Sequence, residues 1–260
     1  AEEPPAEEPP AEEPPAEDCD SIFTEDRSPS FSPGSQIENS LGMELVWIPR
    51  GRFLMGSSPS EPGHLSDESP LRKVGISRGF WMGRYEVTQE EFIKVLGYNP
   101  SQYQGLRRPV EGVPWEEARR FCRELSEREG ETYRLPTEAQ WEYACRADSQ
   151  QPRYGDIEKI AWYGGNSKGA TQPVGMKRPN SWGLYDMLGN VREWCRDWYG
   201  PYEKNSPVID PKGPAWGTER VIRGGSWFTQ RYRCRAAYRQ DAPNSRSSLI
   251  GFRVILYRDR

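Results

Sequence analysis

Apolar residues recur at helical spacing in three stretches of the chain. A capping box over 88–91 is followed by three apolar side chains that fall on one helix face. The stretch 114–129 begins with proline, is followed by glycine, and carries an apolar stripe between them. A second capping box over 137–140 opens a shorter apolar stripe. The pattern therefore predicts three short helices.

Shorter apolar bursts, separated by Gly and Pro, are typical of strands. Two short strands are predicted on either side of a turn within 44–55, and a third within 79–87. The segments 220–227, 232–239 and 251–257 have the character of loops and short strands. Three short helices with small antiparallel sheets and little regular secondary structure place the fold in the α+β class.

The N-terminal region differs in composition from the rest. Residues 1–18 repeat a five-residue unit of Ala, Glu and Pro. Such side chains bury too little apolar surface to offset the entropy lost on ordering, so we expect residues 1–40 to be a disordered or extended acidic spacer. We expect residues 41–260 to form one domain. No targeting or lipidation motif is visible at Ala1, so if the protein is exported we expect a targeting segment or membrane anchor to have been removed.

The charge balance limits the classes of partner. The net charge is -4, and residues 1–18 hold eight acidic groups and no basic one, which leaves about +4 on the rest of the chain. A nearly neutral domain of this size does not predict nucleic-acid binding. No apolar run approaches the 18 residues of a membrane-spanning helix. We therefore expect a membrane connection only through a removed N-terminal anchor.

Two residue types limit the chemistry. The single histidine, His64, cannot supply a multi-histidine metal centre, and it argues against a Ser-His-Asp triad. The five cysteines show no C-x-x-C spacing, so a structural zinc site is not predicted.

Several motifs occur together along the chain, and they share an order with one protein family. They lie at 44–49, 53–56, 85–89, 109–115, 133–144, 182–194, 223–227 and 251–253. In this order they resemble the sulfatase-modifying-factor domain, the family of the formylglycine-generating enzyme. The resemblance implies a C-type-lectin-like α+β fold over the domain. Because such proteins are often secreted, it also implies an extracytoplasmic, cell-surface location.

The resemblance does not extend to the catalytic cysteines. In the formylglycine-generating enzyme a cysteine pair between the Gly-Gly-Ser-aromatic turn and an Arg-Tyr-Arg-Cys stretch binds copper(I). Here only 228–230 separates Trp227 from 231–234, and neither cysteine is present. Copper(I) needs soft thiolate ligands, so we expect no copper and no enzymatic activity of this kind. The iron-dependent branch of the family needs several histidines, which this chain lacks.

Two further features follow from the resemblance alone. The family disulfide implies that Cys145 pairs with Cys234, which would stabilise the fold by roughly 3–5 kcal/mol. The family calcium site implies a structural calcium ion held by Asp186, the carbonyls of Gly189 and Val191, and Glu193. Carboxylate and carbonyl oxygens are the ligands that calcium prefers. The alternative is that Asp186 caps a turn and Glu193 pairs with an arginine.

The interval 228–249 departs most from the family. Relatives carry asparagines there at positions where this chain has aromatic, Arg and Ser side chains, whereas Cys234, Arg235, Ala237 and Arg239 are retained at matching spacing, as are Pro243 and Arg246. The substituted positions are Phe228, Thr229, Gln230, Tyr232, Arg233, Tyr238, Gln240, Asp241, Ser245, Ser247, Ser248 and Leu249. Such side chains are typical of recognition surfaces. The pattern resembles the variable region of proteins diversified by a mutagenic retroelement.

Three hypotheses remain. The first is a non-catalytic binding protein that presents the 228–249 surface to a protein or glycan ligand. The second is a family enzyme, an oxidoreductase or maturation factor, that acts without the cysteine pair. The third is a structural subunit of an envelope complex. Ordinary sequence drift would also replace asparagines in a loop.

Overall fold

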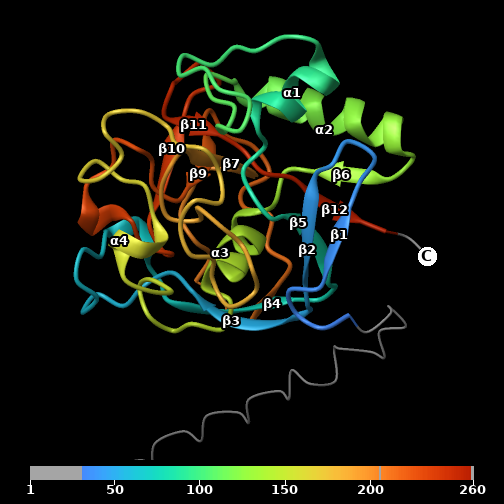
Figure 1. The fold of residues 1–260 in the computed structure, drawn as a ribbon. Coiled ribbons are helices and arrows are strands. Elements are labelled where there is room, and N and C mark those ends of the chain that lie inside the picture. The colour runs from blue at the N-terminus through green and yellow to red at the C-terminus, as the bar shows by residue number, and fades with distance from the viewer. Residues whose placement is uncertain (1–30, 205, 259–260) are drawn as a thin grey trace, which may run out of the picture.

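The computed structural model describes residues 31–204 and 206–258, which form a mixed α+β fold (Figure 1). Residues 1–30 of the spacer expected at 1–40 lie outside these residues. The helices are α1 (Gln89–Leu96), α2 (Trp115–Glu129), α3 (Glu138–Arg146) and the single turn α4 (Ile157–Ile160). The strands are β1 (Gln36–Glu38), β2 (Glu44–Ile48), β3 (Gly51–Met55), β4 (Arg72–Ile76), β5 (Phe80–Gly83), β6 (Thr132–Arg134), β7 (Arg192–Trp198), β8 (Val208–Ile209), β9 (Arg220–Arg223), β10 (Arg239–Ala242), β11 (Ile250–Gly251) and β12 (Ile255–Tyr257). None of the helices in the described ranges is long and apolar enough to cross a membrane.

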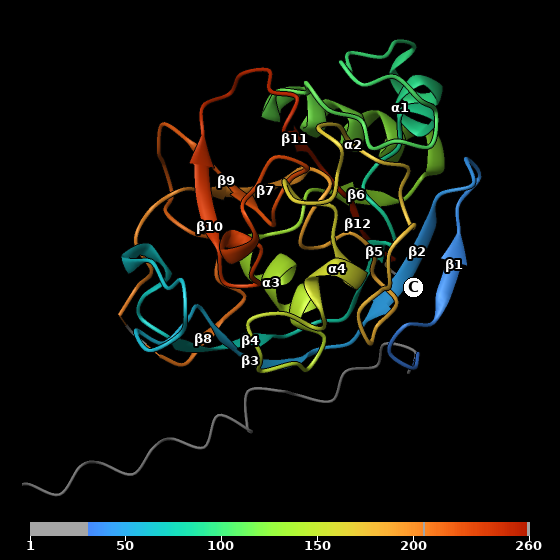
Figure 2. The ribbon, with the colours of Figure 1, turned by 60° about the vertical axis from the view of Figure 1, so that its left-hand side comes forward.

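The strands form three small sheets. Their orders are β1-β2-β5-β12-β6, β10-β9-β7-β11 and β3-β4-β8. Pairing is antiparallel except between β11 and β7 and between β4 and β8, which are parallel. Figure 2 shows the second sheet standing beside α3, with the third sheet below it. The last strand, β12, pairs with both β5 and β6 and is therefore an interior strand of the first sheet.

The three predicted helices are confirmed together with their capping signals. The Thr88 and Thr137 side chains each accept a hydrogen bond from the N3 backbone, and the Glu91 and Gln140 side chains each accept one from the N-cap backbone. Helix α2 ends at Gly130, which adopts a left-handed conformation with φ 67°. Strands β2, β3 and β5 lie within the predicted segments.

Three predictions need correction. The segment 232–239 was expected to contain a strand, but Arg231–Arg233 forms a 3-10 turn and β10 begins only at Arg239. Helix α4 has four residues, which is too short to give a periodic pattern. The domain also begins before residue 41, because β1 pairs with β2 and Phe31 packs edge-on against Trp47 and Trp81.

Large aromatic residues fill two hydrophobic clusters. Trp141 and Trp182 belong to one cluster, and Trp47, Trp81, Trp115 and Trp194 belong to the other. These six tryptophans are buried, whereas Trp162 and Trp198 are only partly buried. Buried indole groups find acceptors, as when Trp194 Nε1 donates to the Val113 carbonyl at 2.8 Å.

Candidate functional site

The 228–249 interval connects two strands of the second sheet. It starts just after β9 and its Gly-Gly-Ser-Trp turn, passes through β10, and ends at β11. Strand β10 pairs with β9 in a register that places Arg239 opposite Arg223. The interval is therefore held at both ends and in its middle by one sheet, while the connections between can reach the surface.

Burial divides the interval into two sets of residues. The retained Cys234, Arg235, Ala237 and Arg239 are all buried, whereas the retained Pro243 and Arg246 are exposed. Of the substituted positions, Phe228, Gln230, Tyr232, Arg233, Asp241 and Ser245 are exposed, and Gln240, Ser247, Ser248 and Leu249 are partly exposed. Phe228 is 68% exposed and Tyr232 is 51% exposed, which is unusual for large aromatic side chains.

Two of the expected contact residues belong to the interior. Thr229 is buried, and its hydroxyl accepts hydrogen bonds from the Ser226 backbone at 2.9 Å and from Arg192 at 3.3 Å. Tyr238 is buried as well, with its hydroxyl 3.5 Å from an Arg233 nitrogen. The expectation that these two side chains contact a ligand is corrected, because both hold the loop from beneath.

Buried arginines connect the interval to distant parts of the chain. Arg235 binds both oxygens of Glu68, at 2.9 Å and 2.5 Å, and also pairs with Glu61. Arg239 binds both oxygens of Glu138, at 2.7 Å and 2.8 Å. Bidentate pairs of this kind fix position as well as charge. They hold the backbone under the exposed side chains to the 61–68 segment and to α3.

Two other arginines bear out a structural role. Arg223 donates to the carbonyls of Ala237 and Tyr238 at 2.7 Å and 2.6 Å, and it pairs with Glu142. Arg253 donates to the Gly83 carbonyl at 2.9 Å. Arg134 differs from these two: it is exposed, with its guanidinium 5.9 Å from the Tyr257 ring centre.

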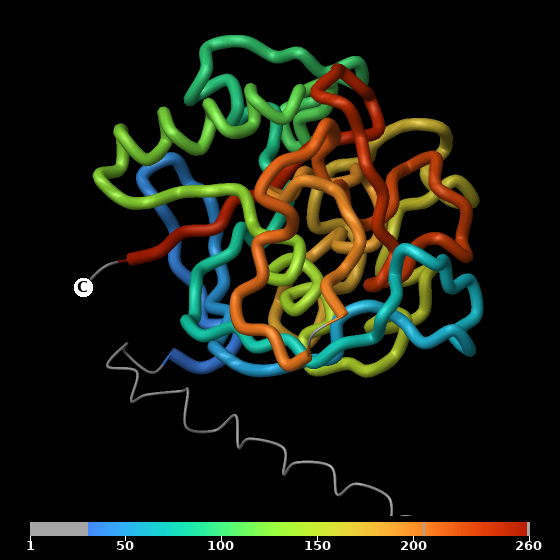
Figure 3. Tube along the Cα trace, turned by 180° about the vertical axis from the view of Figure 1, so that it is seen from behind, coloured from blue at the N-terminus to red at the C-terminus, as the bar shows by residue number. Residues whose placement is uncertain are grey.

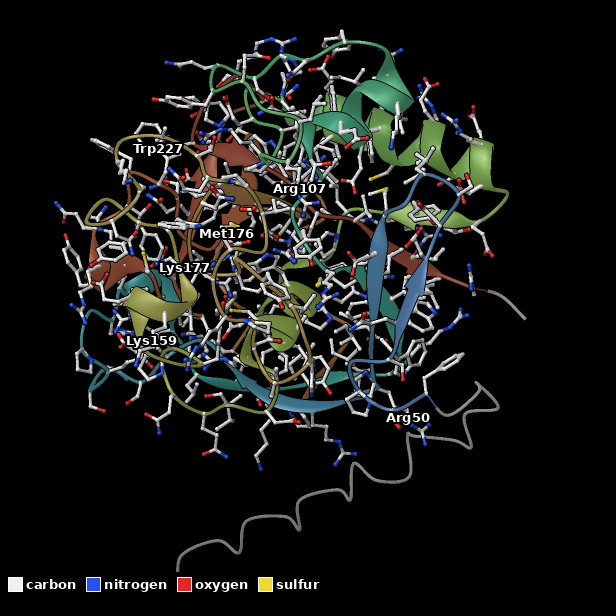
Figure 4. All side chains as sticks on the ribbon, viewed as in Figure 1. Arg50, Arg107, Lys159, Met176, Lys177 and Trp227 are labelled. Atoms are coloured by element: carbon white, nitrogen blue, oxygen red, sulfur yellow. The ribbon has the colours of Figure 1, made fainter. Side chains whose placement is uncertain are left out.

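Three aromatic side chains that the sequence does not predict to lie together border the interval: Trp227, Tyr103 and Phe228. The Trp227 ring lies 5.2 Å from Tyr103 and 5.6 Å from Phe228, both edge-on. Trp227 Nε1 donates to the Ser248 carbonyl at 2.9 Å and so joins the two ends of the interval. Figure 4 shows Trp227 on the side of the molecule that also carries Met176 and Lys177. Tyr103 comes from a loop far away in the sequence, and no local signal predicts this contact.

The cysteines of the described residues are buried free thiols. They are Cys122, Cys145, Cys195 and Cys234. Cys145 and Cys234 belong to the same core cluster, but the structure has no bond between them, so the disulfide stays a prediction. Burial raises the pKa of each of these two thiols to about 12, which leaves little reactive thiolate at neutral pH.

The two side chains expected to bind calcium, Asp186 and Glu193, have different hydrogen-bond partners. Asp186 is buried, its Oδ2 accepts from the Gly175 backbone at 2.8 Å, and its Oδ1 has no partner. An unpartnered buried carboxylate oxygen fits a cation ligand. Glu193 instead binds Arg253 through both oxygens at 2.6 Å and accepts from Trp141 at 2.7 Å. For Glu193 the structure has the alternative, pairing with an arginine.

A third carboxyl group, Glu86, lies in this region and was not predicted. It accepts from the Val191 backbone at 3.0 Å and from Asn190 at 2.8 Å. Burial, then the charges of Asp186 and Glu193, raise the pKa of Glu86 well above its ordinary value, and burial raises the pKa of Asp186 to about 6. Three carboxyl groups, Glu86, Asp186 and Glu193, thus share Arg253 as a neighbouring cation. Within the described ranges, no three His, Cys, Asp or Glu side chains gather closely enough to hold a metal by themselves.

The chain is similar to proteins with several different names. Residues 33–258 match the family described as "Sulfatase-modifying factor enzyme 1-like domain". The chain is 30% identical over 285 residues to the formylglycine-generating enzyme of Mus musculus, covering 81% of this chain and 74% of that protein. It is 34% identical over 241 residues to the serine/threonine-protein kinase pkn1 of Chlamydia caviae, covering 81% of this chain. The match spans 37% of the length of the kinase.

A solved structure extends the comparison to the fold. Treponema denticola variable protein 1 superposes with a TM-score of 0.78 at 29% identity, covering 85% of this chain and 98% of that chain. The α+β, C-type-lectin-like fold expected from the motifs is thereby confirmed.

Proposed function

Since this chain belongs to the sulfatase-modifying factor enzyme 1-like family, we propose that it uses the family fold as a non-catalytic frame for binding a ligand. The binding surface consists of Phe228, Gln230, Tyr232, Arg233, Gln240, Asp241, Ser245, Ser247, Ser248 and Leu249. The ligand is a protein or a glycan, and the protein acts outside the cytoplasm at a cell surface. The similarity to Treponema denticola variable protein 1 supports this choice.

One observation carries the proposal. The side chains that depart from the family pattern are mostly exposed, whereas the retained Arg235 and Arg239 between them are buried and ion-paired. Exchanging an exposed side chain leaves these pairs intact, so the surface can change while the frame is kept. Rigid aromatic rings and arginines also supply much contact area for little loss of side-chain entropy.

The test compares two triple variants of the full chain on a glycan array and an array of extracellular proteins. In the first, Phe228→Ala, Tyr232→Ala and Arg233→Ala remove the largest exposed side chains of the proposed surface. In the matched control, Leu54→Ala, Leu71→Ala and Arg123→Ala remove exposed side chains elsewhere. We expect the first variant to lose binding at least tenfold with an unchanged melting temperature, and the control to bind like the wild type. Equal binding by both variants would contradict the proposal.

A second candidate is an enzyme of the same family. The 30% identity to the mouse formylglycine-generating enzyme supports it, although the 228–230 segment contains no cysteine. With no paired thiolates available we propose that copper(I) is not a cofactor. Oxygen uptake with cysteine-containing peptides, measured with and without added copper(I), separates the two candidates. Turnover that depends on copper would replace the binding function with the enzymatic one.

A further inference from the structure

A cavity of about 600 Å³ lies away from the 228–249 surface, beneath the loop that joins β7 to β9. The strands β3 and β4 and the start of α3 contribute its floor through Met55, Arg72 and Glu138. In Figure 3, seen from behind, this loop runs in orange across the middle of the molecule and reaches the strands at the bottom. Strand β8, within the loop, pairs in parallel with β4. The cavity is large enough for a small organic ligand.

The cavity floor contains a buried cation without a counter-ion. Arg72 is only 5% exposed, and its guanidinium makes no ion pair with any described residue. Its Nε has no hydrogen-bond partner, one terminal nitrogen lies 3.7 Å from Met55 Sδ, and its guanidinium carbon lies 4.3 Å from the Tyr202 ring centre. Arg223, Arg235, Arg239 and Arg253 are equally buried, and each of them binds a carboxylate. Buried charges are normally paired, and among the described residues no carboxylate forms an ion pair with Arg72.

Of the three carboxyl groups that line the cavity, the buried Glu138 and Asp197 are engaged elsewhere, and the exposed Glu203 forms no ion pair with Arg72. Glu138 is bound by Arg239 at 2.7 Å and has Arg223 at 3.4 Å. Asp197 accepts a hydrogen bond from the Glu138 backbone at 3.0 Å. The Tyr202 ring has Arg239 at 4.2 Å in addition to Arg72, so two guanidinium groups approach one ring. Lys212 adds a further positive charge to the lining.

The remaining walls are apolar or aromatic. Pro201, Val208, Pro211 and Pro214 line the cavity, and the Trp216 side chain at its boundary is 83% exposed. A tryptophan exposed to this degree, next to prolines that lack a donor N–H, favours contact with an apolar or aromatic group. The cavity thus combines a buried arginine that pairs with no carboxylate, further charged groups at Lys212 and Glu203, and a largely apolar wall.

We propose that this cavity binds a small organic anion, whose carboxylate pairs with Arg72 and whose aromatic or apolar body packs against Trp216 and the prolines. Carboxylate and guanidinium match in shape and charge, and the buried setting strengthens the pair. The site is separate from the proposed recognition surface and does not depend on it.

The experiment uses the full chain and two probes that differ in charge. 1-Naphthoate and 1-naphthalenemethanol are titrated by isothermal calorimetry into the wild type and into Arg72→Met, Arg72→Lys and Trp216→Ala. Sodium sulfate serves as an anion without an apolar body. Arg123→Met, on the exposed side of α2, removes a surface arginine away from the cavity and is the control.

We expect the wild type and the control to bind naphthoate at least tenfold more tightly than either the alcohol or sulfate. Arg72→Met abolishes this preference for the anion, Arg72→Lys keeps part of it, and Trp216→Ala weakens both naphthalene probes by severalfold without changing their ratio. Because Trp216 is exposed, its substitution leaves the fold intact even if a change at Arg72 does not. Absence of naphthoate binding at millimolar concentration, equal affinity for the alcohol, or an unchanged preference in a folded Arg72→Met overturns the proposal. Sulfate binding as tight as naphthoate overturns the role of the apolar wall.

Discussion

Asp197 shows how burial changes the behaviour of one carboxyl group. It is the sixth residue of β7, and its Oδ2 accepts from the backbone of Glu138 at the start of α3. Burial, then the charge of Glu138, raises the pKa of Asp197 to about 7. A carboxyl group whose folded pKa lies above the unfolded value near 4 favours the folded state at low pH. This contribution is lost as the pH rises from about 4 to about 7.

We predict that Asp197→Asn raises stability at pH 8 by about 2–4 kcal/mol and flattens the pH dependence between pH 4 and 8. The amide oxygen can still accept the Glu138 N–H, so the contact is kept while the ionisation is removed. Urea unfolding at pH 4, 6 and 8 measures both effects. As a control, Asp148→Asn changes an exposed carboxyl group and leaves the slope as it is in the wild type. A variant less stable than the wild type at pH 8 would refute this role.

Asp186 carries the calcium prediction at the same scale. Its Oδ1 has no partner in the protein, and a bound cation would stabilise the folded state by mass action. We predict that millimolar calcium raises the melting temperature of the wild type by several degrees and has no effect on Asp186→Ala. Asp186 has φ 59°, a conformation that asparagine tolerates better than alanine. Asp186→Asn therefore controls for backbone strain and keeps part of the shift, whereas an equal shift in the alanine variant rules out the site.

At the scale of elements, buried ion pairs of arginine hold the connecting segments in place. Arg235 follows the 3-10 turn at 231–233 and ties it to Glu68, with both side chains almost fully buried. Removing one partner leaves the other as an uncompensated buried charge, which costs about 3–5 kcal/mol. The shape of the 228–249 interval thus depends on ion pairs beneath it.

We predict that Arg235→Met lowers the free energy of unfolding by about 3–5 kcal/mol. Tyr232→Ala, three residues away on the exposed side, changes it by less than about 0.5 kcal/mol. Chemical denaturation of both variants gives the comparison directly. Similar losses in the two variants would show that exposed and buried positions do not differ in the way the structure indicates.

Short sequence motifs predicted the helices, because the signals that start and end a helix lie within the helix or next to it. The capping residues Thr88 and Thr137 and the terminal Gly130 fixed the helices, because caps act within one turn. Contacts between segments that are distant in the sequence could not be predicted from any local motif. The Glu68 partner of Arg235, the Tyr103 neighbour of Trp227 and the burial of Thr229 all depend on tertiary packing. The family motifs supplied the fold, and the exposure of most substituted positions agrees with the role expected of them.

The anion-binding cavity was also beyond sequence reasoning. Arg72 stands in an ordinary strand, and Trp216 lies in a Gly- and Pro-rich loop. Neither position suggests a site by itself, since the absence of a counter-ion becomes visible only once every neighbour is known. A buried arginine can be recognised as unpaired only in three dimensions.

At the scale of the whole molecule, the predicted disulfide would join two distant segments of the chain within one core cluster. Cys145 on α3 and Cys234 beside the 3-10 turn are far apart in sequence but share one cluster. We predict that air-oxidised protein has two fewer free thiols than reduced protein, and that reduction lowers stability by roughly 3–5 kcal/mol. Thiol titration in denaturant, with Cys145→Ser and Cys122→Ser, assigns the pair. Equal thiol counts before and after reduction would exclude it.

The buried arginine–glutamate pairs determine which positions of the sequence tolerate substitution. Because Glu61, Glu68 and Glu138 hold the backbone through Arg235 and Arg239, the outward side chains contribute almost nothing to folding. A gene that randomises codons for those outward positions would therefore yield mostly folded offspring. The same randomisation applied to the glutamates would yield few, so the molecule separates the part of its sequence that can be rewritten from the part that cannot.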